Sequence, residues 1–161
     1  MVDFNELYRR YAPDVHRFSF WLSGDPVTAD DATAETFARA WTRREAIRVG
    51  TVKAYLLTIA RNVVLHHFRR TRPSAELNRD LHDPAPDPER ALLAREDLTR
   101  VLRALDQLRE EDRAAFLLRV DHGLSYDSVA RALGISLSAA KVRVHRVRLK
   151  LAMARTKETT K

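Results

Sequence analysis

Apolar residues recur every three or four positions along most of this chain, which is the spacing that places them on one side of an α-helix. Only four glycines and few strand-like alternations interrupt this pattern, so it predicts an all-α fold. The predicted helices run from about Asp3 to Leu22, from Pro26 to about Trp41, from about Thr51 to Arg70, from about Ser125 to Leu133, and onward from about Leu137.

The first three helices carry enough apolar residues to form a small domain of their own. Asp25 followed by proline is a typical helix start, because the carboxylate accepts from free backbone N–H groups and the proline suits the first helical position. Pro13 is expected to bend or interrupt the first helix. Core packing is the expected role of Trp41. The other side chains expected inside are Phe4, Leu7, Tyr8, Tyr11, Val15, Phe18, Leu22, Leu56, Ile59, Ala60 and Val63.

The two C-terminal helices are joined by a short turn whose residues indicate a helix-turn-helix. Ser125 can cap the first helix, Gly134 suits the left-handed residue that ends it, and Ser136 can cap the second. Ile135 can fill the angle between them. Val129, Ala130 and Leu133 in the first helix, and Ala140, Val144, Val147 and Leu151 in the second, form the predicted packing faces. Such a motif inserts its second helix into the DNA major groove.

Charge supports a polyanionic partner for this second helix. The segment 141–161 holds eight Lys or Arg residues and one acid, Glu158, and the whole chain has a net charge of +7 and a pI near 10.2. Without acids to pair with, these like charges weaken a helix unless an anion offsets them. Nucleic acid is therefore favoured over a membrane surface or an acidic protein.

Proline divides the chain into two parts. Four of the six prolines lie between Pro73 and Pro88, in an acidic stretch without helical periodicity, which is typical of an extended linker. The predicted organisation is two small helical domains, residues 1–72 (net +4) and 94–161 (net +6), joined by a linker of residues 73–93 (net −3).

Composition and spacing argue against several classes of function. The chain has no cysteine, so thiol catalysis and cysteine-rich zinc sites are excluded. His66 and His67 are adjacent and point about 100° apart on a helix, and His82 and His122 lack nearby ligands. The acids show no pairing suited to acid–base catalysis. No apolar run approaches about 18 residues. We therefore expect a cytoplasmic protein without membrane insertion that is not an enzyme and uses no metal or cofactor.

Four segments together resemble bacterial RNA polymerase sigma factors of the extracytoplasmic-function (ECF) group of the sigma-70 family. They are DDATAETFARAW (residues 30–41), AYLLTIARN (54–62), GLSY (123–126) and KVRVHR (141–146). They occur in both predicted domains, in the family's order and at its spacing. The resemblance implies a region 2-like helical bundle at 1–72 and a region 4-like helix-turn-helix domain at 94–161.

The resemblance also implies a mechanism and its residues. Such proteins bind core RNA polymerase, at the clamp of the largest subunit and the flap of the second largest, and direct it to promoter DNA, and anti-sigma factors hold many of them inactive. By similarity, the polymerase surface would include Asp31, Glu35, Phe37 and Arg39. The −10 element would be read and opened by Lys53, Tyr55, Arg61, Asn62, Arg69 and Arg70. The −35 element would meet Ser138, Lys141, Arg143, His145, Arg146, Arg148 and Lys150.

Two departures from the family pattern limit what can be transferred. Ala34 replaces a common glutamine before the Glu-Thr-Phe run, and Ser138-Ala139-Ala140-Lys141-Val142 replaces Gly-Thr-Val-Lys-Ser, so promoter preference does not carry over. Two other classes stay open. One is a stand-alone regulator that binds a two-fold symmetric operator as a dimer. The other is an interaction module whose basic tail binds an acidic partner.

Overall fold

The structure, a computed structural model, describes residues 3–70 and 88–159. Its N-terminal domain consists of α1 (Phe4–Ser23), α2 (Pro26–Thr42) and α3 (Val52–Arg70), with the short 3-10 turns η1 (Arg44–Ala46) and η2 (Val49–Thr51) between the last two. The three helices pack against one another. No strand occurs in the described residues, and the predicted all-α fold is confirmed.

Local sequence signals set these helix ends. The Asp3 side chain accepts from the backbone N–H of Asn5, and the Asp25 carboxylate accepts from Val27 and Thr28. Gly24 ends α1 in the left-handed conformation (φ 71°). The helix runs through Pro13 without a break.

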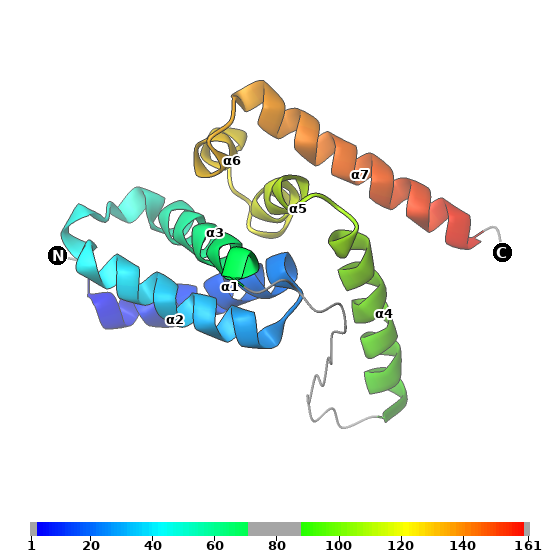
Figure 1. Ribbon diagram of the computed structural model, residues 1–161, viewed down its shortest axis with the longest axis horizontal. Coiled ribbons are helices and arrows are strands. Elements are labelled where there is room, and N and C mark those ends of the chain that lie inside the picture. Colours follow the sequence, from blue (N-terminus) through cyan, green and yellow to red (C-terminus); the bar gives the residue numbers. More distant parts are fainter. Residues whose placement is uncertain (1–2, 71–87, 160–161) are drawn as a thin grey trace.

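The C-terminal domain consists of α4 (Pro88–Asp106), α5 (Glu110–Phe116), the π-helical turn η3 (Leu117–Asp121), α6 (Tyr126–Leu133) and α7 (Leu137–Thr159). In Figure 1, α4 (green) rises toward α5, and α7 (orange to red), the longest helix of this part, runs from α6 to the C-terminus. Helix α4 starts at Pro88, inside the segment expected to be linker. Residues 73–87 of that expected linker lie outside the described residues.

Most side chains expected in the core are buried or partly buried, but two aromatic residues are exposed. Tyr8 is 47% exposed and Trp41 is 48% exposed, so the expected core role of Trp41 is wrong. Both lie at the rim of the α1–α2 contact. Trp41 packs edge-on against Phe4, with 4.9 Å between the ring centroids. The Arg44 guanidinium carbon lies 4.1 Å from the centroid of the Trp41 ring. An amphipathic aromatic residue is well suited to this half-exposed position.

The two domains contact each other. Helix α3 packs against α6, and α1 packs against α5 and η3, so that buried residues of both domains form one connected hydrophobic cluster. In the cluster, Phe18 and Leu22 of α1 are fully buried, as is Leu118 of η3. No helix in residues 3–70 or 88–159 combines the length and apolar character needed to cross a bilayer.

Candidate nucleic-acid interface

The turn between α6 and α7 has the geometry that its sequence predicts. The Ser125 hydroxyl accepts from the backbone N–H of Ser128 (3.1 Å), and Gly134 ends α6 with φ 66°. The Ser136 hydroxyl accepts from the N–H of Ala139 (3.1 Å) at the start of α7. These caps satisfy N–H groups that a helix start leaves free and fix the angle of α7.

The packing of α7 determines which of its side chains face solvent. Ala140, Val144 and Val147 are fully buried at helical spacing, so one side of the helix is held against the domain. The opposite side is exposed. Of the side chains predicted to contact the −35 element, it presents Ser138, Lys141, His145, Arg146, Arg148 and Lys150.

Arg143 differs from this exposed set. It follows Ala140 by three positions and therefore turns toward α5, where its Nη1 donates to Asp112 Oδ1 (2.9 Å) and its Nη2 lies 3.2 Å from Glu111 Oε2. The Asp112 side chain is only 1% exposed, so Arg143 neutralises a buried carboxylate. The structure thus gives Arg143, which was expected to contact the −35 element, a partner within its own domain.

Two of the α3 side chains predicted to meet the −10 element contact the other domain instead. Arg61 donates from Nε and Nη2 to the two carboxylate oxygens of Glu110 in α5, at 2.8 Å each. Lys53 Nζ donates to the backbone carbonyl of His122 at 3.0 Å. The sequence pattern placed both side chains outward from the N-terminal domain, but it contained no sign that a second domain covers this direction.

The remaining α3 candidates are more accessible. Asn62, Arg69 and Arg70 are exposed, and Tyr55 is half-buried against the hydrophobic cluster. The exposed part of α3 therefore offers two arginines and an amide, whereas Tyr55 is positioned partly by core contacts.

Helix α2 presents the acidic surface predicted to meet a protein partner. Asp31 is exposed, and Glu35 accepts from Arg39 at 2.6 Å, one helical turn away. Glu35 also lies 3.7 Å from His67 of α3. Phe37 is 4% exposed and packs edge-on against Tyr8, so it supports this surface from beneath and is not itself available for contact.

The first turn of α5 contacts several candidate site residues, which the sequence analysis did not predict. Glu110, Glu111 and Asp112 occupy the helix start, where carboxylates interact favourably with free N–H groups. Each binds an arginine that had been predicted to meet DNA: Glu110 binds Arg61, and the other two bind Arg143. The sequence shows three consecutive acids at a helix start, but it does not predict which arginines they bind.

The histidines in the described part of the chain do not gather into a site. His66 is exposed, His67 is half-buried, and His122 is buried at the domain contact, while His82 lies outside the described residues. Within residues 3–70 and 88–159, no group of three or more His, Asp or Glu side chains is arranged to hold a metal ion.

Burial lowers the pKa of His122 below its ordinary value. Its ring packs edge-on against Phe18 at 5.7 Å between centroids, and its Nε2 lies 3.4 Å from Asp121 Oδ2 without a hydrogen bond. His122 is therefore a neutral interface residue at physiological pH.

Known proteins match both domains in order. Residues 7–73 match the family model of Sigma-70 region 2, and residues 98–151 match Sigma-70, region 4. The ECF RNA polymerase sigma factor SigE of Mycolicibacterium smegmatis is 34% identical over 94% of this chain and 61% of its own length. SigL of Mycobacterium tuberculosis H37Rv is 32% identical over 86% of this chain and 81% of its own length. BldN of Streptomyces coelicolor is 32% identical, and this chain spans 56% of its length.

Solved structures show the same arrangement of helices. The sigma factor RpoE from Bartonella quintana, in complex with the anti-sigma factor NepR, superposes with a TM-score of 0.74 at 26% identity, covering 92% of this chain and 94% of that one. CnrH, in complex with the cytosolic domain of CnrY, gives a TM-score of 0.73 at 23% identity over 96% of this chain and 88% of its own, which shows the fold alone. On both sequence and structure, this chain belongs to the ECF group of the sigma-70 family.

Proposed function

We propose that this chain is a promoter-specificity subunit, an initiation factor rather than an enzyme, that binds core RNA polymerase and directs it to −10 and −35 promoter elements. The observation that carries the proposal is the basic, exposed side of α7 in a helix-turn-helix domain that follows a region 2 domain. A polymerase-bound factor uses two such domains to contact two separated promoter elements.

The −35 contact is assigned to the exposed side of α7. Lys141, Arg146 and Arg148 can bind guanine edges or phosphates, and Ser138 near the helix start is suited to a phosphate oxygen. His145 completes the exposed set. Lys150 lies in the C-terminal half of α7, away from the turn, and is assigned to the phosphate backbone.

The −10 contact is assigned to α3. Asn62, Arg69 and Arg70 are accessible in the structure, whereas Lys53 and Arg61 become accessible only when their contacts to the C-terminal domain break. Tyr55 is the large aromatic residue of this helix and is assigned to stacking on an unpaired base.

The polymerase contact is assigned to two acids of α2, the exposed Asp31 and the partly exposed Glu35. Asp31 and Glu35 lie on one side of the helix with Arg39, which suits a basic partner surface such as the polymerase clamp. The flap is assigned to the C-terminal domain. An anti-sigma factor is the proposed inhibitor, which is supported by the complex of RpoE with NepR.

Run-off transcription tests this function. Purified bacterial core polymerase is assayed on the DNA upstream of the chain's own gene, with and without the protein. We expect a discrete start site that depends on the protein and is lost in the D31A/E35A variant. The matched control is E96A/D97A, which removes two exposed acids from α4, far from α2 along the chain.

The same assay separates this function from the two other classes. Absence of a transcript, together with tight and salt-sensitive binding of the chain alone to a two-fold symmetric site, would establish the dimeric regulator. Absence of a transcript with no loss of DNA binding after Arg143 and Arg146 are changed to alanine would favour the interaction module.

A further inference from the structure

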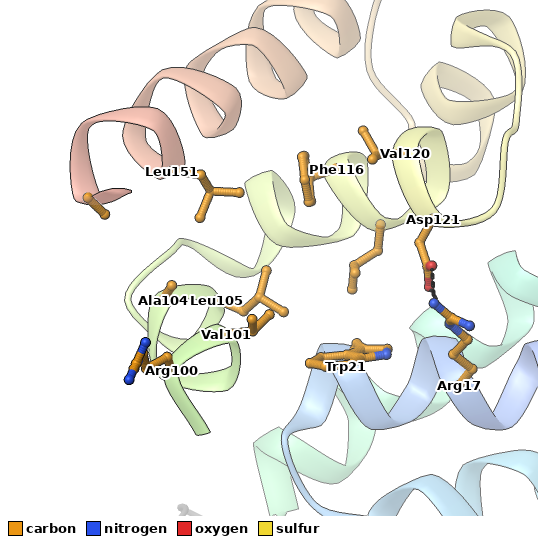
Figure 2. A pocket seen from close by; sticks show the side chains of 12 residues that line it. Arg17, Trp21, Arg100, Val101, Ala104, Leu105, Phe116, Val120, Asp121 and Leu151 are labelled. Carbon is orange, nitrogen blue, oxygen red and sulfur yellow. Dashed lines mark hydrogen bonds and ion pairs between the residues drawn. The ribbon is translucent and has the colours of Figure 1, made fainter. Parts of the chain in front are cut away.

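A hollow among helices of both domains has the size of a small-molecule site. Figure 2 shows Trp21 of α1 facing Val101 and Leu105 of α4 across it, with Phe116 and Val120 on a further side. Its volume is about 420 Å³. Sites for small molecules commonly measure about 300–1,000 Å³ and are mainly apolar. The hollow is therefore large enough to hold a ligand.

The wall of the hollow determines the chemistry of a ligand that fits it. Nine of the twelve lining residues have aliphatic or aromatic side chains, and the other three are Arg17, Arg100 and Asp121. The lining contains no serine, threonine, asparagine or glutamine. A nucleotide base or a sugar needs several hydrogen-bond partners in its site, whereas a hydrocarbon chain needs none. The wall therefore favours a hydrocarbon chain.

Part of this apolar wall is in contact with water. Val101 is 47% exposed and Val120 is 46% exposed, although each has a buried neighbour in the same hollow, Leu105 and Leu117. A hydrocarbon chain that displaces water from the two valines gains free energy in proportion to the apolar area that it covers. The exposed valines thus provide a driving force for binding.

The two arginines that line the hollow differ in their availability. The Arg17 guanidinium is held by both carboxylate oxygens of Asp121, at 2.9 and 2.7 Å. Arg100 Nη1 lies 3.7 Å from Asp97 Oδ1, which is too long for a hydrogen bond, and the two side chains are 60% and 74% exposed. Such a surface pair contributes little. Arg100 can therefore bind an anion at the rim of the hollow.

We propose that the hollow binds a single-chain amphiphile with an anionic head, of the fatty-acid class. The tail lies against Trp21, Val101 and Val120, and the carboxylate pairs with Arg100, whose planar guanidinium matches both carboxylate oxygens. Asp121 repels an anion at the Arg17 end, which sets the direction of the tail. None of the side chains assigned to DNA or to the polymerase clamp lines the hollow, so the site does not depend on the proposed function.

Isothermal titration calorimetry of the full-length chain tests the site. The ligands are hexanoate, octanoate and decanoate, each below the concentration at which it forms micelles. We expect one molecule bound per chain and an affinity that rises about fourfold for each added methylene, because each methylene leaves water for an apolar wall. Decanol, which lacks the charge, should bind about tenfold more weakly than decanoate.

Two pairs of variants locate the head and the tail. R100Q removes the proposed partner of the carboxylate, and R103Q makes the same charge change at an exposed α4 position outside the hollow. We expect R100Q to bind decanoate about tenfold more weakly than R103Q. A104F fills the hollow with a phenyl group and should abolish saturable binding. A38F places the same group on the exposed side of α2 and should leave binding unchanged.

The two tryptophans of the chain report independently where the tail lies. Trp21 lines the hollow, whereas Trp41 lies at the rim of the α1–α2 contact, outside it. A decanoate that carries bromine on its tail quenches the fluorescence of a tryptophan that it contacts. It should quench W41F, in which Trp21 remains, and leave the emission of W21F, in which Trp41 remains, unchanged.

The opposite results would overturn the proposal. Absence of saturable binding for every alkanoate would show that the hollow is not a ligand site. Binding to A104F as tight as to A38F, or quenching of W21F as strong as that of W41F, would place the ligand elsewhere on the chain. Equal affinities for decanol and decanoate, or equal affinities of R100Q and R103Q for decanoate, would exclude the anionic class.

Discussion

The buried side chain of Arg113 connects the ends of several helices by hydrogen bonds. The Arg113 guanidinium donates to the carbonyls of Leu105 (2.8 Å), Leu108 (3.0 Å) and, across the domain contact, Leu22 (2.6 Å). Burial lowers the pKa of Arg113, while Asp106 and Glu110 oppose that shift. An arginine remains charged at neutral pH even so. Its donors reach the Leu22 carbonyl at the C-terminal end of α1, the Leu108 carbonyl just after α4, and the Leu105 carbonyl, which also accepts from the Leu108 backbone N–H.

Replacing Arg113 with methionine should destabilise the protein strongly. R113M keeps much of the side-chain volume but removes the arginine donor from the buried Leu22 and Leu108 carbonyls, and we expect a loss of about 3 kcal/mol in the free energy of unfolding. Urea unfolding followed by circular dichroism measures it. R103M, at an exposed position of α4, should change stability by about 0.5 kcal/mol or less. Equal losses in the two variants would refute the role given to Arg113.

At the level of elements, the sequence predicts the helix ends, because contacts between neighbouring residues determine them. The capping roles of Asp25, Ser125 and Ser136, and the left-handed end at Gly134, depend on contacts within four positions, and all are confirmed. The start of α4 at Pro88 was not predicted, because proline was interpreted as a mark of linker although it also suits the first turn of a helix.

Gly134 provides a test at this scale. A Cβ at this position would meet no atom within 4 Å, so G134A changes only the backbone preference at φ 66°. We expect a loss of about 1 kcal/mol, which is typical of a left-handed non-glycine residue, and a lower melting temperature. G50A is the matched control, because Gly50 also has free space for a Cβ but no left-handed backbone. A melting temperature unchanged in G134A would contradict the turn geometry.

For the whole molecule, the contact between domains is the feature that the sequence does not predict. Arg17 and Asp121 are 104 positions apart, and neither belongs to a motif. Lys53 and Arg61 were correctly placed on the outward side of α3, yet a direction that is outward for one domain can be the interior of an assembled chain. Periodicity reports the faces of single helices, whereas the fit of two domains depends on surfaces that periodicity does not encode.

Acid should weaken this domain contact through His122. Because burial lowers its pKa in the folded chain, the unfolded chain binds the proton more readily, and the free energy of unfolding falls as the pH drops below about 6.5. The surrounding charges act in both directions: Asp121 and Asp14 favour the protonated ring, and Lys53 and Arg17 oppose it. The decline stops once the pH is below the lowered pKa.

Comparing the wild type with H122Q isolates this effect from the titration of carboxylates. Unfolding free energies are measured between about pH 7.5 and about pH 5.5, and the wild type should lose more stability over this range than H122Q. Parallel pH profiles for the two proteins would show that His122 does not titrate with folding.

The first turn of α5 limits how this chain can vary. Glu110, Glu111 and Asp112 stabilise their own helix start, bind an arginine of α3, and bind an arginine of α7. A substitution that removes one of these charges should therefore change both the local stability and the availability of an arginine that we propose to contact DNA. Under the proposed function, promoter affinity depends on a turn that does not itself touch DNA, so we expect variants with altered promoter strength at these three positions as well as along α7.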